Sequence, residues 1–119
     1  MESSNDFGKL GEQKAVEHLL GKGYAILERN YRYLKAEIDI IARMGDTLVI
    51  VEVKSRNTGF LEDIMDTVNA KKVKLLTMAA DHYVQENELD VEVRFDVITI
   101  IKSGSEIDLE HLENAFYHF

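Results

Sequence analysis

Hydrophobic and polar residues alternate along two neighbouring stretches near the middle of the chain. These stretches, residues 36–43 and 47–55, are rich in Ile and Val, and Gly45-Asp46 lies between them. β-branched residues favour strands and a Gly-Asp pair favours a tight turn, so the pattern predicts a β-hairpin. One face of the hairpin is apolar and should pack on a helix. This face comprises Ile38, Ile40 and Ala42 on the first strand and Val49, Val51 and Val53 on the second.

Four polar residues share the other face of the predicted hairpin. The turn sets a register in which Asp39 lies opposite Glu52, and Glu37 lies opposite Lys54. Like charges directly opposite each other destabilise a sheet, so we expect a cation between Asp39 and Glu52. Two such carboxylates suit Mg²⁺ or Mn²⁺ with water and substrate phosphate, and this indicates phosphodiester chemistry. The alternative is a solvated β-ladder in which Glu37 and Lys54 form an ion pair.

Helices and strands follow one another along the rest of the chain. The order α-β-β-β-α-β, with a short tail element, predicts an α/β fold with a small mixed β-sheet flanked by helices. We assign residues 7–119 to one domain and expect residues 1–6 to be a disordered extension. The predicted elements outside the hairpin are a helix from Asn5 or Asp6 to about Leu20, a strand from near Tyr24, a helix from Asp66 or Thr67 to about Glu86, and a strand at 91–101.

Composition supports one compact domain and excludes several classes of protein. The 119 residues, 45% of them hydrophobic, can bury one core but hardly two. The absence of Cys excludes disulfides and thiolate zinc sites. No apolar stretch reaches the roughly 18 residues of a membrane-spanning helix. We therefore expect no membrane partner and, by default, a cytoplasmic location.

The net charge of −8 argues against a nucleic-acid partner, because phosphate binding relies on Lys and Arg. The acidic excess is local, however. Residues 1–80 hold 12 basic and 12 acidic residues, whereas residues 81–119 hold 2 and 10. Residues 29–56 carry six basic and four acidic groups, and three of those four acids belong to the proposed catalytic site. The distribution of charge therefore leaves a nucleic-acid partner open.

Residues 29–35 interleave aromatic and basic side chains, a mixture that can stack bases and contact the nucleic-acid backbone. Arg29 and Arg32 in this segment, together with Arg56 and Lys71, are the expected nucleic-acid contacts. The alternative for the tyrosines of the segment is that they are half-buried strand residues. The alternative for Lys71, which lies near the start of a predicted helix, is that it contributes only to solubility.

Three further features have structural interpretations. Arg94 and Asp96 share a face of the last predicted strand, where we expect an ion-pair brace. The apolar residues of the loop at 60–65 could close over substrate, dock on a second subunit or fold onto the core. The histidines show no metal-ligand spacing, and we expect each to be a surface or partly packed side chain: His18, His82, His111 and His118.

Several short motifs follow one another along the chain: Gly11-Glu12, Arg29-Asn30, Glu37-Ile38-Asp39, the segment 51–56, Lys71, the segment 94–97 and Asn114-Ala115-Phe116. This ordered set resembles the bacterial YraN-like family of restriction-endonuclease-like nucleases, a superfamily that includes Holliday-junction resolvases. The resemblance implies a restriction-endonuclease-like core in which Asp39 and Glu52 hold the metal and Lys54 completes the Glu-x-Lys motif. It also implies that Glu12, on the first helix, joins the metal ligands. Ala36 stands where the family usually has Gly. The resemblance covers residues 7–116.

Together these patterns favour a metal-dependent nuclease that hydrolyses phosphodiester bonds, with DNA, including branched DNA, favoured over RNA. Lys54 would orient or activate water, Glu37 would tune Lys54, and Arg56 and Lys71 would contact phosphate. One alternative is a nucleic-acid-binding module that keeps the fold without turnover. Another is a protein-interaction subunit, such as a homodimer, that uses the loop at 60–65.

Overall fold

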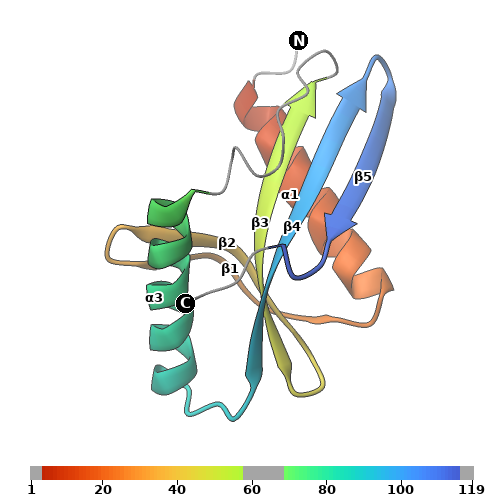
Figure 1. Ribbon diagram of the computed structural model, residues 1–119. Helices are drawn as coiled ribbons and strands as arrows, with labels where there is room; N and C mark the ends of the chain where they lie inside the picture. The colour runs from red at the N-terminus through yellow and green to blue at the C-terminus, as the bar shows by residue number, and fades with distance from the viewer. Residues whose placement is uncertain (1–3, 58–68, 116–119) are drawn as a thin grey trace.

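The computed structural model describes residues 4–57 and 69–115 of the chain. Within these ranges the chain forms two helices and five strands (Figure 1). In chain order they are α1 (Ser4–Gly21), β1 (Ala25–Tyr33), β2 (Ala36–Met44), β3 (Thr47–Asn57), α3 (Ala70–Glu86), β4 (Glu92–Ser103) and β5 (Glu106–Leu112). The predicted mixed α/β fold is confirmed at this level, and the predicted tail element is a full strand, β5.

The five strands form one sheet in the spatial order β1-β2-β3-β4-β5. β3 and β4 are parallel, and the other neighbouring pairs are antiparallel. Both faces of the sheet are apolar because each packs on one helix, α1 on one face and α3 on the other. The α1 cluster includes Ala15, Leu19, Ile40, Val51 and Ile98, and the α3 cluster includes Leu76, Tyr83, Ile50, Phe95 and Val97.

Both helices begin at residues other than those predicted. α1 begins at Ser4, so residues 4–6 belong to the helix rather than to the extension expected at 1–6. α3 begins at Ala70 and is capped by Asn69, whose side-chain oxygen accepts the backbone N–H of Lys72 at 2.9 Å. The predicted cap at residues 66–67 and the loop at 60–65 lie outside the described residues.

The β2–β3 hairpin has the predicted register near its turn. Its pairs run from Met44–Thr47 to Ile40–Val51, and Gly45 has the positive φ, 59°, that favours glycine in tight turns. The described ladder between the two strands ends at Ile40–Val51. The predicted pairs further along the hairpin therefore do not form, and the next residue of β2, Asp39, lies where the two strands separate.

Side chains of β2 change face at Asp39. Ile38 lies in the α3 cluster, whereas Ile40 lies in the α1 cluster, so the predicted apolar row is wrong at Ile38. The cause is packing: beyond this point the β1–β2 hairpin leaves β3 and lies beside α3 (Figure 1), where Tyr31 and Tyr33 join Ile38 in the α3 cluster. β1 is also irregular here, because Asn30 has a positive φ of 53°.

Candidate functional site

Asp39 occupies the gap that opens between β2 and β3. Its Oδ2 atom accepts the backbone N–H of Val53 at 2.7 Å, so the carboxylate takes part in holding the two separating strands together. Burial, followed by the charge of nearby Glu52, raises the pKa of Asp39 from 3.8 to about 7. Glu12 raises this pKa further, whereas the bond from Val53 and the charge of Lys72 oppose the rise. Asp39 therefore lies among negative charges that the protein balances only in part.

Glu52 is the most buried carboxylate of this region, with 5% of its surface exposed. It lies on β3, and its Oε1 atom accepts a hydrogen bond from the Nζ atom of Lys72, which reaches across from α3. The Nζ atom of Lys54 lies 3.9 Å from the same oxygen. Burial, followed by the charge of Lys72, lowers the pKa of Lys54, and Glu52 opposes this shift. Two ammonium groups thus converge on one carboxylate oxygen.

Glu12 approaches the same region from α1, because Gly11 lets the helix lie very close to β3. A Cβ atom at Gly11 would lie 2.1 Å from the Oγ atom of Ser55, so a side chain larger than hydrogen requires a shift. The Oε1 atom of Glu12 is buried and has no hydrogen-bond partner among the described residues. A buried carboxylate oxygen without a partner is unfavourable, and a cation would satisfy it.

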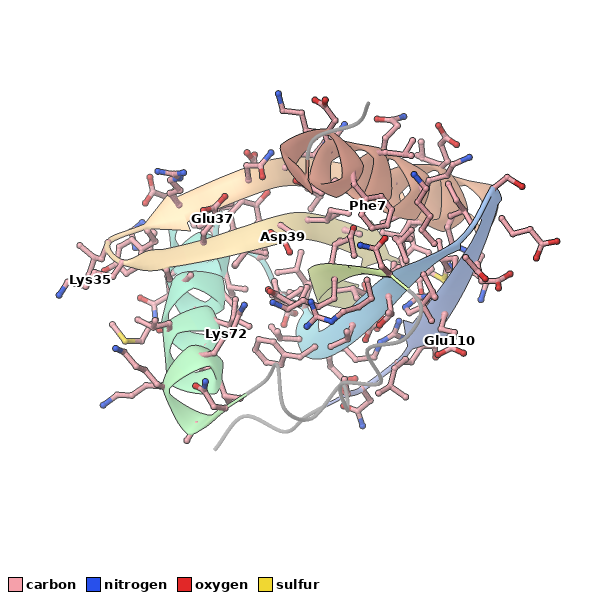
Figure 2. All side chains as sticks on the ribbon, turned by 90° about the horizontal axis from the view of Figure 1, so that it is seen from above. Phe7, Lys35, Glu37, Asp39, Lys72 and Glu110 are labelled. Atoms are coloured by element: carbon pink, nitrogen blue, oxygen red, sulfur yellow. The ribbon has the colours of Figure 1, made fainter. Side chains whose placement is uncertain are left out.

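A cavity of about 380 Å³ lies beside these groups, between the N-terminal half of α1 and the end of β3. Figure 2 shows Asp39 on β2, with Phe7 of α1 on one side of it and Lys72 of α3 on the other. Four of the sequence-predicted site residues line the cavity: Glu12, Asp39, Lys54 and Arg56. The structure therefore brings together most of the predicted chemistry, with Glu52 joined to it through Lys54.

The donors in this region match a hard divalent cation in kind. Mg²⁺ binds carboxylate oxygens, and one or two carboxylates suffice when water and substrate complete the shell. Over the described ranges, no three His, Cys, Asp or Glu residues are grouped so that they could hold an ion together. In this arrangement, a metal would therefore have at most two of the carboxylates of Asp39, Glu52 and Glu12 as direct ligands.

Three of the predicted site residues lie on the β1–β2 hairpin, apart from this cavity: Glu37, Arg32 and Arg29. Glu37 is exposed, and its carboxylate lies 3.5 Å from the guanidinium of Arg32, so the predicted pairing of Glu37 with Lys54 is wrong. Arg29 is exposed and donates to the side-chain oxygen of Gln13 at 3.2 Å. The separation of β2 from β3 carries Glu37 and Arg32 away from the cavity, because they lie on the part of the β1–β2 hairpin that is beside α3. Arg29 pairs with Ile40 before that point, and its side chain is turned to α1.

The tyrosines of the aromatic and basic segment pack on α3. The ring of Tyr31 meets that of Tyr83 edge to face, with centroids 5.2 Å apart. The ring of Tyr33 stacks on His82 at 3.9 Å. Their interpretation as half-buried strand residues is therefore confirmed.

Lys72 is the site residue that the sequence analysis missed, since it selected Lys71. Lys71 is exposed, whereas Lys72 contacts Glu52. The helical period could have identified Lys72. It lies four residues before Leu76, whose side chain is buried in the α3 cluster, so the two residues share the face of α3 that packs on the sheet. A lysine on the buried stripe of a helix needs an anionic partner, and the one carboxylate placed inward on the facing strand is Glu52.

A second polar cluster lies on the α1 face of the sheet. Arg94 and Asp96 form the predicted ion pair through two hydrogen bonds of 2.8 and 2.9 Å, and the carboxylate of Asp96 is fully buried. His111 bonds the same carboxylate at 2.7 Å and contacts His18 at 3.1 Å. The buried position of His111 and its link to His18 were not predicted, because residues from two distant elements meet only in the folded chain.

The fold and this site define a small mixed α/β protein in which carboxylates and lysines gather where two strands of the sheet separate. Residues 11–100 match the model of a family described as "Uncharacterised protein family UPF0102", and the chain belongs to this family. The predicted YraN-like relationship is confirmed at this level.

Relatives match the chain over nearly its whole length. A UPF0102 protein of Christiangramia forsetii is 51% identical over 119 residues, and one of Flavobacterium psychrophilum is 50% identical, each match covering all of both chains. A UPF0102 protein of Parabacteroides distasonis is 41% identical over 98% of this chain and 97% of its own. Neither of the described helices is long and apolar enough to cross a membrane.

Proposed function

We propose that this protein is a divalent-metal-dependent nuclease with a restriction-endonuclease-like core, and that it hydrolyses phosphodiester bonds, of DNA in preference to RNA. The observation that carries the proposal is the state of Asp39. Its carboxylate is held between two separating strands, where burial, followed by the charge of Glu52, raises its pKa to about 7. A divalent cation binds favourably where nearby positive groups compensate the charges of carboxylates only in part and a cavity leaves room for the ion.

Asp39 and Glu52 would hold the ion, and the unpartnered oxygen of Glu12 would face it or its water shell. An ion at this place supplies Lewis-acid stabilisation of the charge that develops on the phosphate. The oxygen donors fit Mg²⁺ or Mn²⁺ in kind. Arg56 lines the same cavity, which supports a role in contacting a phosphate group of the substrate.

Lys54 would act on the attacking water. Its pKa is lowered, chiefly by burial, so its amine is more readily neutral than an exposed lysine and can accept a proton from water. The water oxygen then bonds to phosphorus while the ester P–O bond breaks, and the leaving oxygen takes up a proton. The products are a phosphate monoester and a free hydroxyl.

One observation favours a second candidate function, a nucleic-acid-binding module that keeps the fold without turnover. Lys72 already contacts Glu52, so one charge of the proposed metal pair is balanced by the protein itself. In a module of this kind the lysines would serve only to hold the carboxylates and to bind phosphate. Metal dependence separates the two functions.

The test is a cleavage panel with branched, duplex and single-stranded DNA and with RNA, in Mn²⁺ and in chelator. We expect cleavage of at least one substrate by the wild-type chain in Mn²⁺ and none in chelator. Asp39→Asn should abolish the product, whereas Asp108→Asn, which removes an exposed carboxylate on β5, should leave it unchanged. Product that persists in Asp39→Asn would indicate a contaminating nuclease, and no product from any substrate would favour the binding module.

A further inference from the structure

Lys72 lies in the first turn of α3, and two contacts fix its position. Asn69 caps the helix by accepting the backbone N–H of Lys72 itself, so the cap and the lysine are parts of one turn. From this turn the side chain of Lys72 reaches the sheet, with about a third of its surface (32%) exposed, and its Nζ atom contacts Glu52 Oε1. The contact is therefore built into the start of the helix rather than made by a loose surface chain.

The same contact conflicts with metal binding. Glu52 is almost fully buried, and its Oε1 atom already has Lys72 bonded to it and Lys54 3.9 Å away. A divalent ion bound to this oxygen would lie beside an ammonium group in a poorly solvated place, where like charges repel strongly. The metal and the Lys72 ammonium are thus alternatives at one carboxylate oxygen.

We propose that Lys72 is a cation that takes the place of the metal, holding Glu52 in the metal-free protein and leaving it when a divalent ion binds. This inference rests on the metal site of the proposed function and adds its regulation. A cation stays beside Glu52 through the exchange, an ammonium before it and a divalent ion after it, so the buried carboxylate is never left without a partner.

A cavity next to Lys72 can accommodate its ammonium group after release from Glu52. This cavity has a volume of about 310 Å³, and Lys35 and Lys71, both exposed, line it too. Figure 2 shows Lys35 at the tip of the β1–β2 hairpin and Lys72 on α3. Glu37 also lines this cavity, but its charge is paired with Arg32. Metal binding would therefore free Lys72 to bind a substrate phosphate next to two other lysines, which couples metal binding to nucleic-acid binding.

The test compares Mn²⁺ affinity, by isothermal titration calorimetry, in the wild-type chain, Lys72→Met and Lys74→Met. Lys74 is an exposed lysine two residues further along α3, and its substitution removes the same charge without touching Glu52. We expect Lys72→Met to bind Mn²⁺ about ten-fold more tightly, a size typical of coupling between sites. Lys74→Met should bind like the wild type.

A second variant, Lys72→Arg, should change the Mn²⁺ affinity in the opposite direction. Arg can grip a carboxylate with two parallel hydrogen bonds, so Lys72→Arg should bind Mn²⁺ more weakly than the wild type. This variant carries the test if Lys72→Met fails to fold, which circular dichroism would reveal. Fluorescence anisotropy of a labelled DNA duplex, read before cleavage is detectable, gives the coupling: Mn²⁺ should tighten DNA binding more in the wild type than in Lys72→Met.

The outcomes separate this inference from the proposed function. Equal or weaker Mn²⁺ binding by Lys72→Met, or equal tightening by Lys74→Met, overturns the exchange while a wild-type chain that binds Mn²⁺ keeps its metal site. Tighter Mn²⁺ binding by Lys72→Arg overturns the exchange in the same way. Absence of Mn²⁺ binding in the wild type and in every variant overturns both.

Discussion

Replacing Asp39 with Asn should stabilise the metal-free protein, although Asp39 lies in the middle of the candidate site. The Asn side chain retains an oxygen that can accept the backbone N–H of Val53, so the bond of 2.7 Å between the separating strands is preserved. What the substitution removes is the negative charge, which lies in a buried place close to Glu52 and Glu12. The change is therefore nearly isosteric and tests the charge alone.

The magnitude follows from the pKa of Asp39. A carboxylate whose pKa rises on folding, here from 3.8 to about 7, contributes full stability below its unfolded pKa and loses it as pH rises to the folded pKa. A rise of this size corresponds to roughly 4 kcal/mol of stability lost by pH 8. Asp39→Asn avoids the loss, so the gain should be close to zero near pH 4 and reach about 2 to 4 kcal/mol near pH 8.

The assay is urea unfolding in chelator, followed by circular dichroism, over a pH series from about 4 to about 8. Asp108→Asn, which removes an exposed charge, should show a flat difference from the wild type over the same series. With Mn²⁺ present, the wild type should gain stability by ligand linkage and Asp39→Asn should not. A variant less stable than the wild type by a similar amount at every pH would refute the reasoning, since the bond to Val53 would then outweigh the charge.

Two further substitutions test the contacts around the site. Gly11→Ala should lower the free energy of unfolding by about 1–3 kcal/mol, because its Cβ atom meets the Oγ atom of Ser55, and Ser55→Ala should restore most of this in the double variant; additive losses in urea unfolding would contradict it. Asp96→Ala should lower the free energy of unfolding by about 3–5 kcal/mol, because it leaves Arg94 without the buried partner of its two hydrogen bonds. Thermal unfolding measures this, and a loss within the usual range of surface substitutions, about 0.5 kcal/mol, would show that the ion pair contributes little.

Residues close in sequence made the hairpin predictable. Alternation of apolar and polar side chains identified β2 and β3, and Gly45 identified the turn, which has the backbone conformation that glycine adopts most easily. These signals act over a few residues, and they were enough to predict the pairs down to Ile40–Val51. The ion pair of Arg94 and Asp96 was predictable for the same reason, since the two residues are neighbours on one face of β4.

Prediction from the local pattern failed where packing on a distant element, α3, determines the path of the strand. Extending the register from the turn placed Glu37 opposite Lys54, but packing of Ile38, Tyr31 and Tyr33 on α3 pulls this part of the hairpin away from β3. The side chains then change face at Asp39. A local period cannot report this, because the apolar surface gained on α3 belongs to a helix that begins some thirty residues later, at Ala70.

Local chemistry therefore selected three charged residues that the structure places in the candidate site or beside it: Asp39, Glu52 and Lys54. Tertiary packing decided which of them meet and what balances their charge. Asp39 becomes a bridge to Val53 where the two strands part. Lys72 becomes the partner of Glu52 because α3 packs on the sheet with its first turn near this place, and the N-terminal half of α1 approaches it from the other face. Long-range contacts of this kind depend on how apolar surfaces fit together, and no spacing within a single element encodes them.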